Sequence, residues 1–324
     1  MLDMTGLINT VITMTLLIGI GFFSAKIGVI TEAASKNYSS LIVTICQAFL
    51  MVTSLITSTA VGYTFDTLFQ GLIIVAISAA IHAFCIIVSQ IVTIGIKNVD
   101  EKQMTRYCMV FSNNAFTGFP ILNAVFGAKG VFWATFYCVF FNILVWTWGI
   151  FVLSRANKSI KMCLKNTVFN IGTISVAIGL VLYIAYIVFP NFRLPESVTG
   201  AMTYMSGLCT PITMLICGAS ISRMKPKQLL LNPKIYFLCA VKLIAIPLCV
   251  GFVVKGILVL FNLTGDFANC MVLFSALMAG LPTAASSTAF AEKYDVAPSY
   301  TAACVGMTTI VSMATIPLTV LIFK

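Results

Sequence analysis

The stretch CMVFSNNAFTGFP (residues 108–120) decides the fold, because a related stretch, CMVLFSALMAGLP, recurs at residues 270–282. Five of the thirteen aligned positions are identical, and Pro120 and Pro282 lie 162 residues apart, half the length of the 324-residue chain. A proline removes a backbone donor and crowds the carbonyl one turn earlier, while a glycine two residues before it loosens the same turn. We therefore expect two helices that break near these prolines and restart after them, at corresponding places in the two halves.

The composition around these stretches is that of a membrane protein. Hydrophobic residues make up 60% of the chain and charged residues 9%, with a mean hydropathy of +1.05, whereas a soluble domain is about 25% charged. A membrane-spanning helix needs about 20 mostly apolar residues. Such runs predict an all-α integral membrane protein with ten transmembrane helices, near residues 5–25, 38–58, 68–95, 105–126, 130–153, 167–189, 197–222, 234–261, 266–290 and 297–323.

The repeat divides these helices into two sets of five. The first five-helix repeat covers residues 1–153, a cytoplasmic linker covers 154–166, and the second repeat covers 167–324. Because five is odd, the second repeat must enter the membrane from the opposite face, which gives the inverted plan common among secondary transporters. The broken helices are then the fourth and the ninth.

Basic residues are distributed unequally between the two predicted faces. One face carries fourteen of them and the other carries four, Lys129, Arg193, Lys255 and Lys324. By the positive-inside rule the richer face is cytoplasmic, which places both termini on the non-cytoplasmic side of the plasma (inner) membrane. This topology accounts for the net charge of +10, so no nucleic-acid partner is expected. The fourteen residues are Lys26, Lys36, Lys97, Lys102, Arg106, Arg155, Lys158, Lys161, Lys165, Arg223, Lys225, Lys227, Lys234 and Lys293.

The two breaks predict a polar pocket. Freed backbone groups cannot face lipid, so broken helices persist only inside protein or beside a water-filled cavity. Helix N-termini that point into such a pocket favour an anion, in particular a carboxylate. The alternatives are ordinary proline kinks and polar side chains that only bridge packed helices. The candidate substrate-binding residues are Asn113, Asn114, Gly118, Pro120, Asn123, Gly280, Pro282, Thr283, Ser286 and Ser287.

Charged and titratable residues within the predicted spans are few. All nine acidic residues fall in loops or near span ends, so the pocket favours negative substrates. Lys242 either snorkels to the cytoplasmic face or balances the charge of the substrate. His82 either carries a coupling proton or hydrogen-bonds a neighbour. One histidine without central carboxylates offers no catalytic set, and we expect neither an enzyme, nor a cofactor, nor a metal site.

These features resemble the auxin efflux carrier family, which includes plant auxin carriers and bacterial malate permease-like proteins. The resemblance rests on residues 113–120 followed by Phe126-Gly127, on Gly280-Leu-Pro282 with residues 289–294, on Pro211, and on Lys242 with Pro247. It implies two inverted five-helix repeats, a substrate site at the crossover of helices four and nine, and carboxylate binding by Asn113. Movement against a scaffold of helices one, two, six and seven, and a homodimer, are implied likewise.

The chain departs from the family pattern in two places. The second span reads Gln47-Ala-Phe49 where a proline matching Pro211 is expected, and only a short linker joins the halves, as in the compact bacterial type. We therefore expect a secondary transporter that moves a small organic acid anion, a carboxylate or dicarboxylate resembling malate or auxin, across the lipid bilayer by alternating access. The alternative is a membrane receptor or sensor that binds the anion without translocating it. The acid, the direction and the coupling ion stay open.

Overall fold

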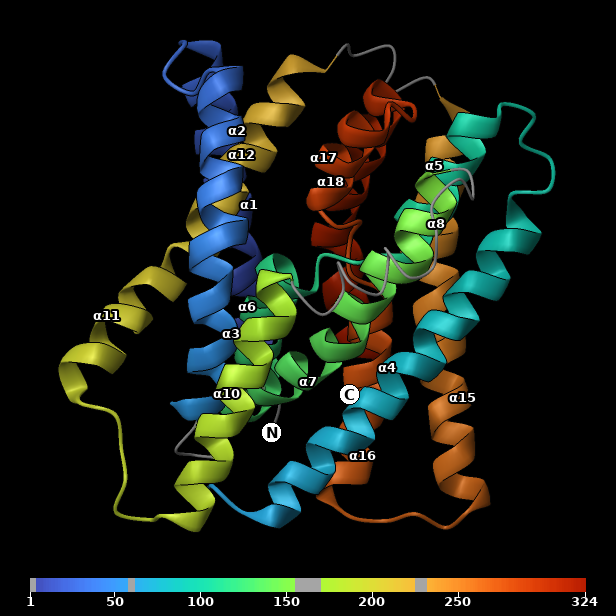
Figure 1. Cartoon of the computed structure of the whole chain (residues 1–324). Coiled ribbons are helices and arrows are strands. Elements are labelled where there is room, and N and C mark those ends of the chain that lie inside the picture. Colours follow the sequence, from blue (N-terminus) through green and yellow to red (C-terminus); the bar gives the residue numbers. More distant parts are fainter. Residues whose placement is uncertain (1–3, 58–61, 155–169, 225–231) are drawn as a thin grey trace.

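The computed structural model describes residues 4–57, 62–154, 170–224 and 232–324, and this part of the chain is helical apart from short connections and one β-bridge (Figure 1). Eight helical stretches in it are long and apolar enough to cross a membrane, which confirms a multi-pass membrane protein. They are α1 (Met4–Lys26); α2 (Glu32–Leu41), η1 (Ile42–Cys46) and α3 (Gln47–Ile56); α4 (Phe65–Val92); α7 (Ala128–Leu144), η3 (Val145–Gly149) and α8 (Ile150–Leu153); α10 (Ile171–Val188); α11 (Glu196–Gly207) and α12 (Cys209–Arg223); α14 (Pro233–Ala240), η4 (Val241–Ala245) and α15 (Ile246–Leu260); and α18 (Pro298–Phe323).

Two further apolar stretches are interrupted. The first consists of α5 (Val99–Val110), the π-helical turn η2 (Asn114–Gly118) and α6 (Phe119–Phe126), and the second of α16 (Asp266–Ala279) and α17 (Ser286–Tyr294). The chain leaves the helical path at residues 111–113 and again at 280–285. The interruptions thus lie in the two repeated sequence stretches.

The first interruption differs in position from the sequence prediction. The helix restarts at Asn114, before Pro120 and not after it. Pro120 occupies the first turn of α6, where its missing N–H and fixed φ angle are tolerated. A π turn also comes just before Pro247, at the start of α15. Such a wide turn shifts the carbonyl that the proline ring would otherwise meet.

The connections between helices alternate between two ends of the molecule. In Figure 1 the α1–α2, α4–α5 and α17–α18 connections lie at the top, and the α10–α11 and α15–α16 connections lie at the bottom. Six of the fourteen basic residues, and all but the first residue of the predicted linker 154–166, lie outside the described residues.

Glycines set how closely α1 and α12 approach each other. A Cβ atom on Gly218 would lie 1.9 Å from the carbonyl oxygen of Ile18, and one on Gly21 would lie 2.2 Å from that of Leu215. The two backbones are therefore in direct contact, as small residues allow in membrane helices. In Figure 1, α1, α3, α10, α11 and α12 form the left part of the molecule, while α4, α5, α15 and α16 form the right part.

Candidate functional site

The two interruptions are hydrogen-bonded to each other. Ser112 and Thr283 face each other as an antiparallel β-bridge. The amide of Asn113 donates to the carbonyl of Pro282 at 2.8 Å, and the amide of Ala284 donates to that of Phe111 at 3.0 Å. Backbone groups released by the helix breaks are thus satisfied within the protein, as they must be where lipid offers no partner. We call residues 111–113 and 280–285 the crossing.

Two side chains cap the C-terminal end of α5 at the crossing. Thr283 Oγ1 donates to the carbonyl of Cys108 at 3.1 Å, and Lys242 Nζ donates to that of Met109 at 3.0 Å. Lys242 also donates to Ser112 Oγ at 3.0 Å. The last carbonyls of a helix lack intrahelical partners and carry partial negative charge, so a cation is favoured there. Lys242 is fully buried and therefore does not snorkel; it points into the crossing.

Tight packing holds the crossing against its surroundings. A Cβ atom on Gly118 would lie 2.8 Å from Leu281 Cδ1, and one on Gly280 would lie 3.0 Å from Pro247 Cβ. The amide of Thr283 donates to Thr308 Oγ1 of α18 at 3.2 Å. A side chain at Gly118 would thus press on the other interruption, and one at Gly280 would press on α15.

Several buried polar atoms without partners belong to residues that are near the crossing in sequence. Asn113 Nδ2 donates to Thr117 Oγ1 at 3.0 Å. Asn114 is 2% exposed, and within the described structure neither its Oδ1 nor its Nδ2 has a hydrogen-bond partner. The same holds for the hydroxyls of Ser275 and Ser287. A buried polar group without a partner costs about 1–3 kcal/mol. A polar ligand that hydrogen-bonds to these atoms would recover that free energy.

The other predicted site residues lie outside the crossing. Pro120 and Ser286 are half-buried in the first turns of α6 and α17. Asn123 is exposed on α6. His82, on α4, is buried, and its Nδ1 lies 2.7 Å from the carbonyl oxygen of Ser78, one turn earlier in the same helix.

Sequence reasoning did not identify Ser112 and Thr308 as site residues. Ser112 directly precedes Asn113, and it belongs to the same repeated stretch that carried the prediction. Thr308 lies within an apolar helix, α18, with no glycine–proline motif beside it, so no local signal indicates its contact with Thr283.

The buried charge at the crossing is positive. Among the described residues the ion pairs are Lys36 with Glu32 and Glu292, and Lys234 with Glu101; Lys242 is in none of them. Its partners are a carbonyl and a hydroxyl. A buried cation without a carboxylate partner makes the surrounding potential favourable to an anion. Over the same described residues, no three His, Cys, Asp or Glu side chains are grouped as metal ligands.

Comparison with models of known protein families gives a match. A family model described as "Membrane transport protein" matches residues 7–320 of the chain. The matched region includes both interruptions, the helix that carries Lys242 and the helix that carries Thr308. A search of curated proteins finds no match.

Proposed function

The chain belongs to the membrane transport protein family, that of the auxin efflux carriers, and from this premise we propose that it is a secondary transporter of small organic acid anions with its substrate site at the crossing. Members of the family are transporters and not enzymes. The observation that carries the proposal is the combination of a buried, carboxylate-free Lys242 with the unpaired side chain of Asn114. A carboxylate supplies acceptors for both.

The hydrogen-bond inventory favours a carboxylate over a neutral ligand. Lysine has three N–H donors, and Lys242 donates two hydrogen bonds in the described structure. Its remaining donor, the amide of Asn114 and the hydroxyls of Ser275 and Ser287 provide polar contacts without a fixed negative group. Charge-assisted hydrogen bonds are about twice as strong as neutral ones, so an ionised acid gains more here than an ester or an alcohol.

The arrangement of helices supports alternating access as the mode of transport. Eight continuous spans and two interrupted stretches together make ten membrane segments, arranged as two inverted repeats with residues 1–153 and 167–324 as the units. The part formed by α1, α3, α10, α11 and α12 acts as the scaffold, and the crossing moves against it. The protein functions in the plasma membrane, with both termini on the non-cytoplasmic side, and forms a homodimer.

Uptake into proteoliposomes tests the proposal. We expect uptake of at least one labelled mono- or dicarboxylate from a panel of organic acids, with pH and sodium gradients varied independently to identify the driving ion. Asn113→Ala should weaken substrate-induced currents in solid-supported electrophysiology. Saturable binding of an acid without any uptake, in either orientation and under every gradient, would favour the receptor or sensor alternative.

A further inference from the structure

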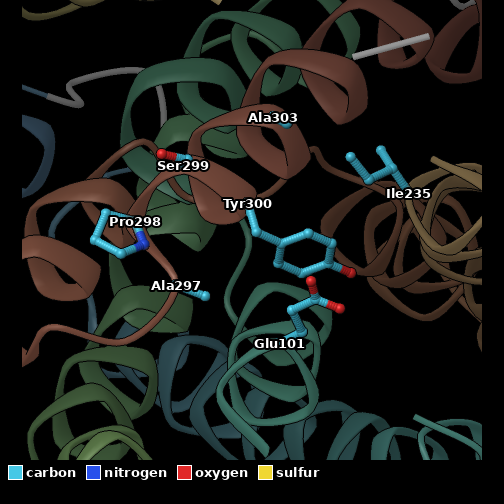
Figure 2. A pocket seen from close by; sticks show the side chains of 7 residues that line it. All are labelled: Glu101, Ile235, Ala297, Pro298, Ser299, Tyr300 and Ala303. Atoms are coloured by element: carbon cyan, nitrogen blue, oxygen red, sulfur yellow. The ribbon is translucent and has the colours of Figure 1, made fainter. Parts of the chain in front are cut away.

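A cavity separate from the crossing lies near the start of α18. It has a volume of about 300 Å³ and is lined by Glu101, Ile235, Tyr300 and Ala303, together with residues 297–299 at the start of the helix (Figure 2). Glu101 precedes Met109 by eight residues, which is about 12 Å along α5. The cavity is therefore about two helical turns away from the residues that form the proposed transport site. Pockets that bind small molecules begin at about this volume.

Glu101 contributes a carboxylate oxygen that is not used by the protein. Lys234 pairs with Oε2 of Glu101. In the part of the chain that the structure describes, the other oxygen, Oε1, makes no hydrogen bond. A carboxylate accepts up to about four hydrogen bonds, so Glu101 can serve a second cation beside Lys234.

Tyr300 adds another acceptor, as the direction of its hydrogen bond shows. The hydroxyl of Thr105 donates its single proton to the carbonyl of Glu101 at 2.7 Å. Tyr300 Oη lies 2.8 Å from the same Thr105 oxygen, so Tyr300 must be the donor in that contact. Its side chain also has Cys304 as a hydrogen-bond partner, and a phenolic oxygen with two lone pairs keeps acceptor capacity for a ligand. In Figure 2 the hydroxyl end of Tyr300 points toward the carboxylate of Glu101.

From this geometry we propose that the cavity binds a primary ammonium group, carried by a free amine or by a phosphatidylethanolamine headgroup. Its polar corner offers acceptors, the Glu101 carboxylate and the Tyr300 oxygen, which match the N–H donors of an ammonium. The wall beside this polar corner is apolar and is formed by Ile235, Ala297 and Ala303. Such a wall suits the carbon atoms next to the ammonium nitrogen. A bare sodium ion needs close oxygen ligands around it and leaves that apolar wall uncovered. The inference does not depend on the transport proposal.

Thermal unfolding of the purified protein in detergent, with ethanolamine or choline added at equal concentration, tests this proposal. Ethanolamine has N–H donors and choline has none. We expect ethanolamine to raise the melting temperature of the wild type by about 2–4 °C at saturation and choline to have no such effect. An equal shift with choline, or the same shift with sodium chloride alone, would overturn the proposal.

Variants separate binding from general loss of structure. Glu101→Gln and Tyr300→Phe should each abolish the shift measured against the variant's own baseline, while Glu196→Gln, at an exposed carboxylate of α11, should keep it. Lys234→Met removes the competing cation, so its shift should exceed that of the wild type. A full shift in both Glu101→Gln and Tyr300→Phe would contradict the assignment.

Nanodiscs distinguish the two sources of the ammonium group. If the lipid headgroup occupies the cavity, the wild type is more stable in phosphatidylethanolamine than in phosphatidylcholine, and added ethanolamine has little further effect in the former. If a free amine is the ligand, ethanolamine stabilises the protein equally in both lipids. Either result supports an ammonium site, and the absence of any ethanolamine effect in phosphatidylcholine argues against one.

Discussion

Lys242 contacts the carbonyl of Met109, and the two residues are 133 positions apart in the chain, the same separation as Lys234 and Glu101. Both pairs join α5 to the run of α14 and η4. Because the Lys242–Met109 pair lies eight residues after the Lys234–Glu101 pair on each side, these two stretches lie parallel and in register. One lysine pairs with a carboxylate in the first turn of α5 and the other caps its C-terminal end. This register aims Lys242 into the crossing.

Replacing Lys242 tests whether its charge serves the substrate. Lys242→Met leaves the carbonyl of Met109 and the hydroxyl of Ser112 without their donor, so we expect a lower melting temperature. We also expect apparent anion affinity to fall about tenfold or more, which corresponds to about 1.4 kcal/mol. Lys255→Met, at an exposed lysine of α15, is the control for lost positive charge. Unchanged affinity in Lys242→Met would remove the lysine from the substrate site.

Replacing Asn114 should weaken substrate binding more than it lowers the stability of the protein without substrate. Its side chain has no partner in the described structure, so Asn114→Ala removes no internal hydrogen bond, and we expect only a small change in melting temperature. Uptake should nevertheless need about tenfold more substrate. Asn142→Ala is a matched control, since Asn142 on α7 also has a buried, unpaired Nδ2. Equal effects of the two variants on uptake would contradict a specific role for Asn114.

Replacing Thr283 should lower both the stability of the crossing and the rate of transport. Thr283→Val removes the hydrogen bond to the Cys108 carbonyl and leaves that acceptor buried, at a cost of about 1–3 kcal/mol. We expect a lower melting temperature and slower uptake. Thr319→Val is the comparison, because the Thr319 hydroxyl bonds within its own helix, to Thr315. An equal loss of uptake in both variants would show that the hydrogen bond between Thr283 and Cys108 has no special role in transport.

The glycine contact between α1 and α12 makes a steric prediction. Gly218→Ala places a methyl group against the backbone of Ile18, and overpacking of this kind costs about 1–3 kcal/mol or more. We expect a clear loss of thermal stability and of folded yield. Gly19→Ala, one residue further along α1, meets no atom within 4 Å and should behave as the wild type. A stable Gly218→Ala protein would show that the two helices are further apart.

His82 offers a test of proton coupling. Its ring lies between aromatic side chains, with Tyr137 at a centroid distance of 5.3 Å, and its Nδ1 is bound to its own helix at Ser78. These contacts indicate a structural role, so His82→Asn should keep the pH profile of uptake even if it lowers the protein's stability. A profile that becomes flat in this variant would instead identify His82 as the proton carrier.

The sequence predicted the membrane class and, near its repeated stretches, the two interruptions. Long apolar runs indicate spans, and Gly280 and Pro282 lie within the second interruption, whereas Gly118 and Pro120 are helical and follow the first one. The direction of Lys242 was not predictable, since the choice between the cytoplasmic face and the crossing depends on which helix faces η4. The contact between Thr308 and Thr283 likewise depends on how α18 packs. The start of the helix at Asn114, ahead of Pro120, follows from pairing with residues 280–285, which are distant in sequence.

The hydrogen bonds between the two interruptions restrict how this protein can move. Pulling either broken helix away would expose the amides of Asn113 and Ala284, with the carbonyls of Pro282 and Phe111, to hydrocarbon, where each bare group costs several kcal/mol. In the proposed alternating access, the four half-helices would therefore move together as one unit. The boundary that such a movement would cross includes the contacts of α6 with α1, of η2 and α18 with α12, and of α7 with α3 and α10.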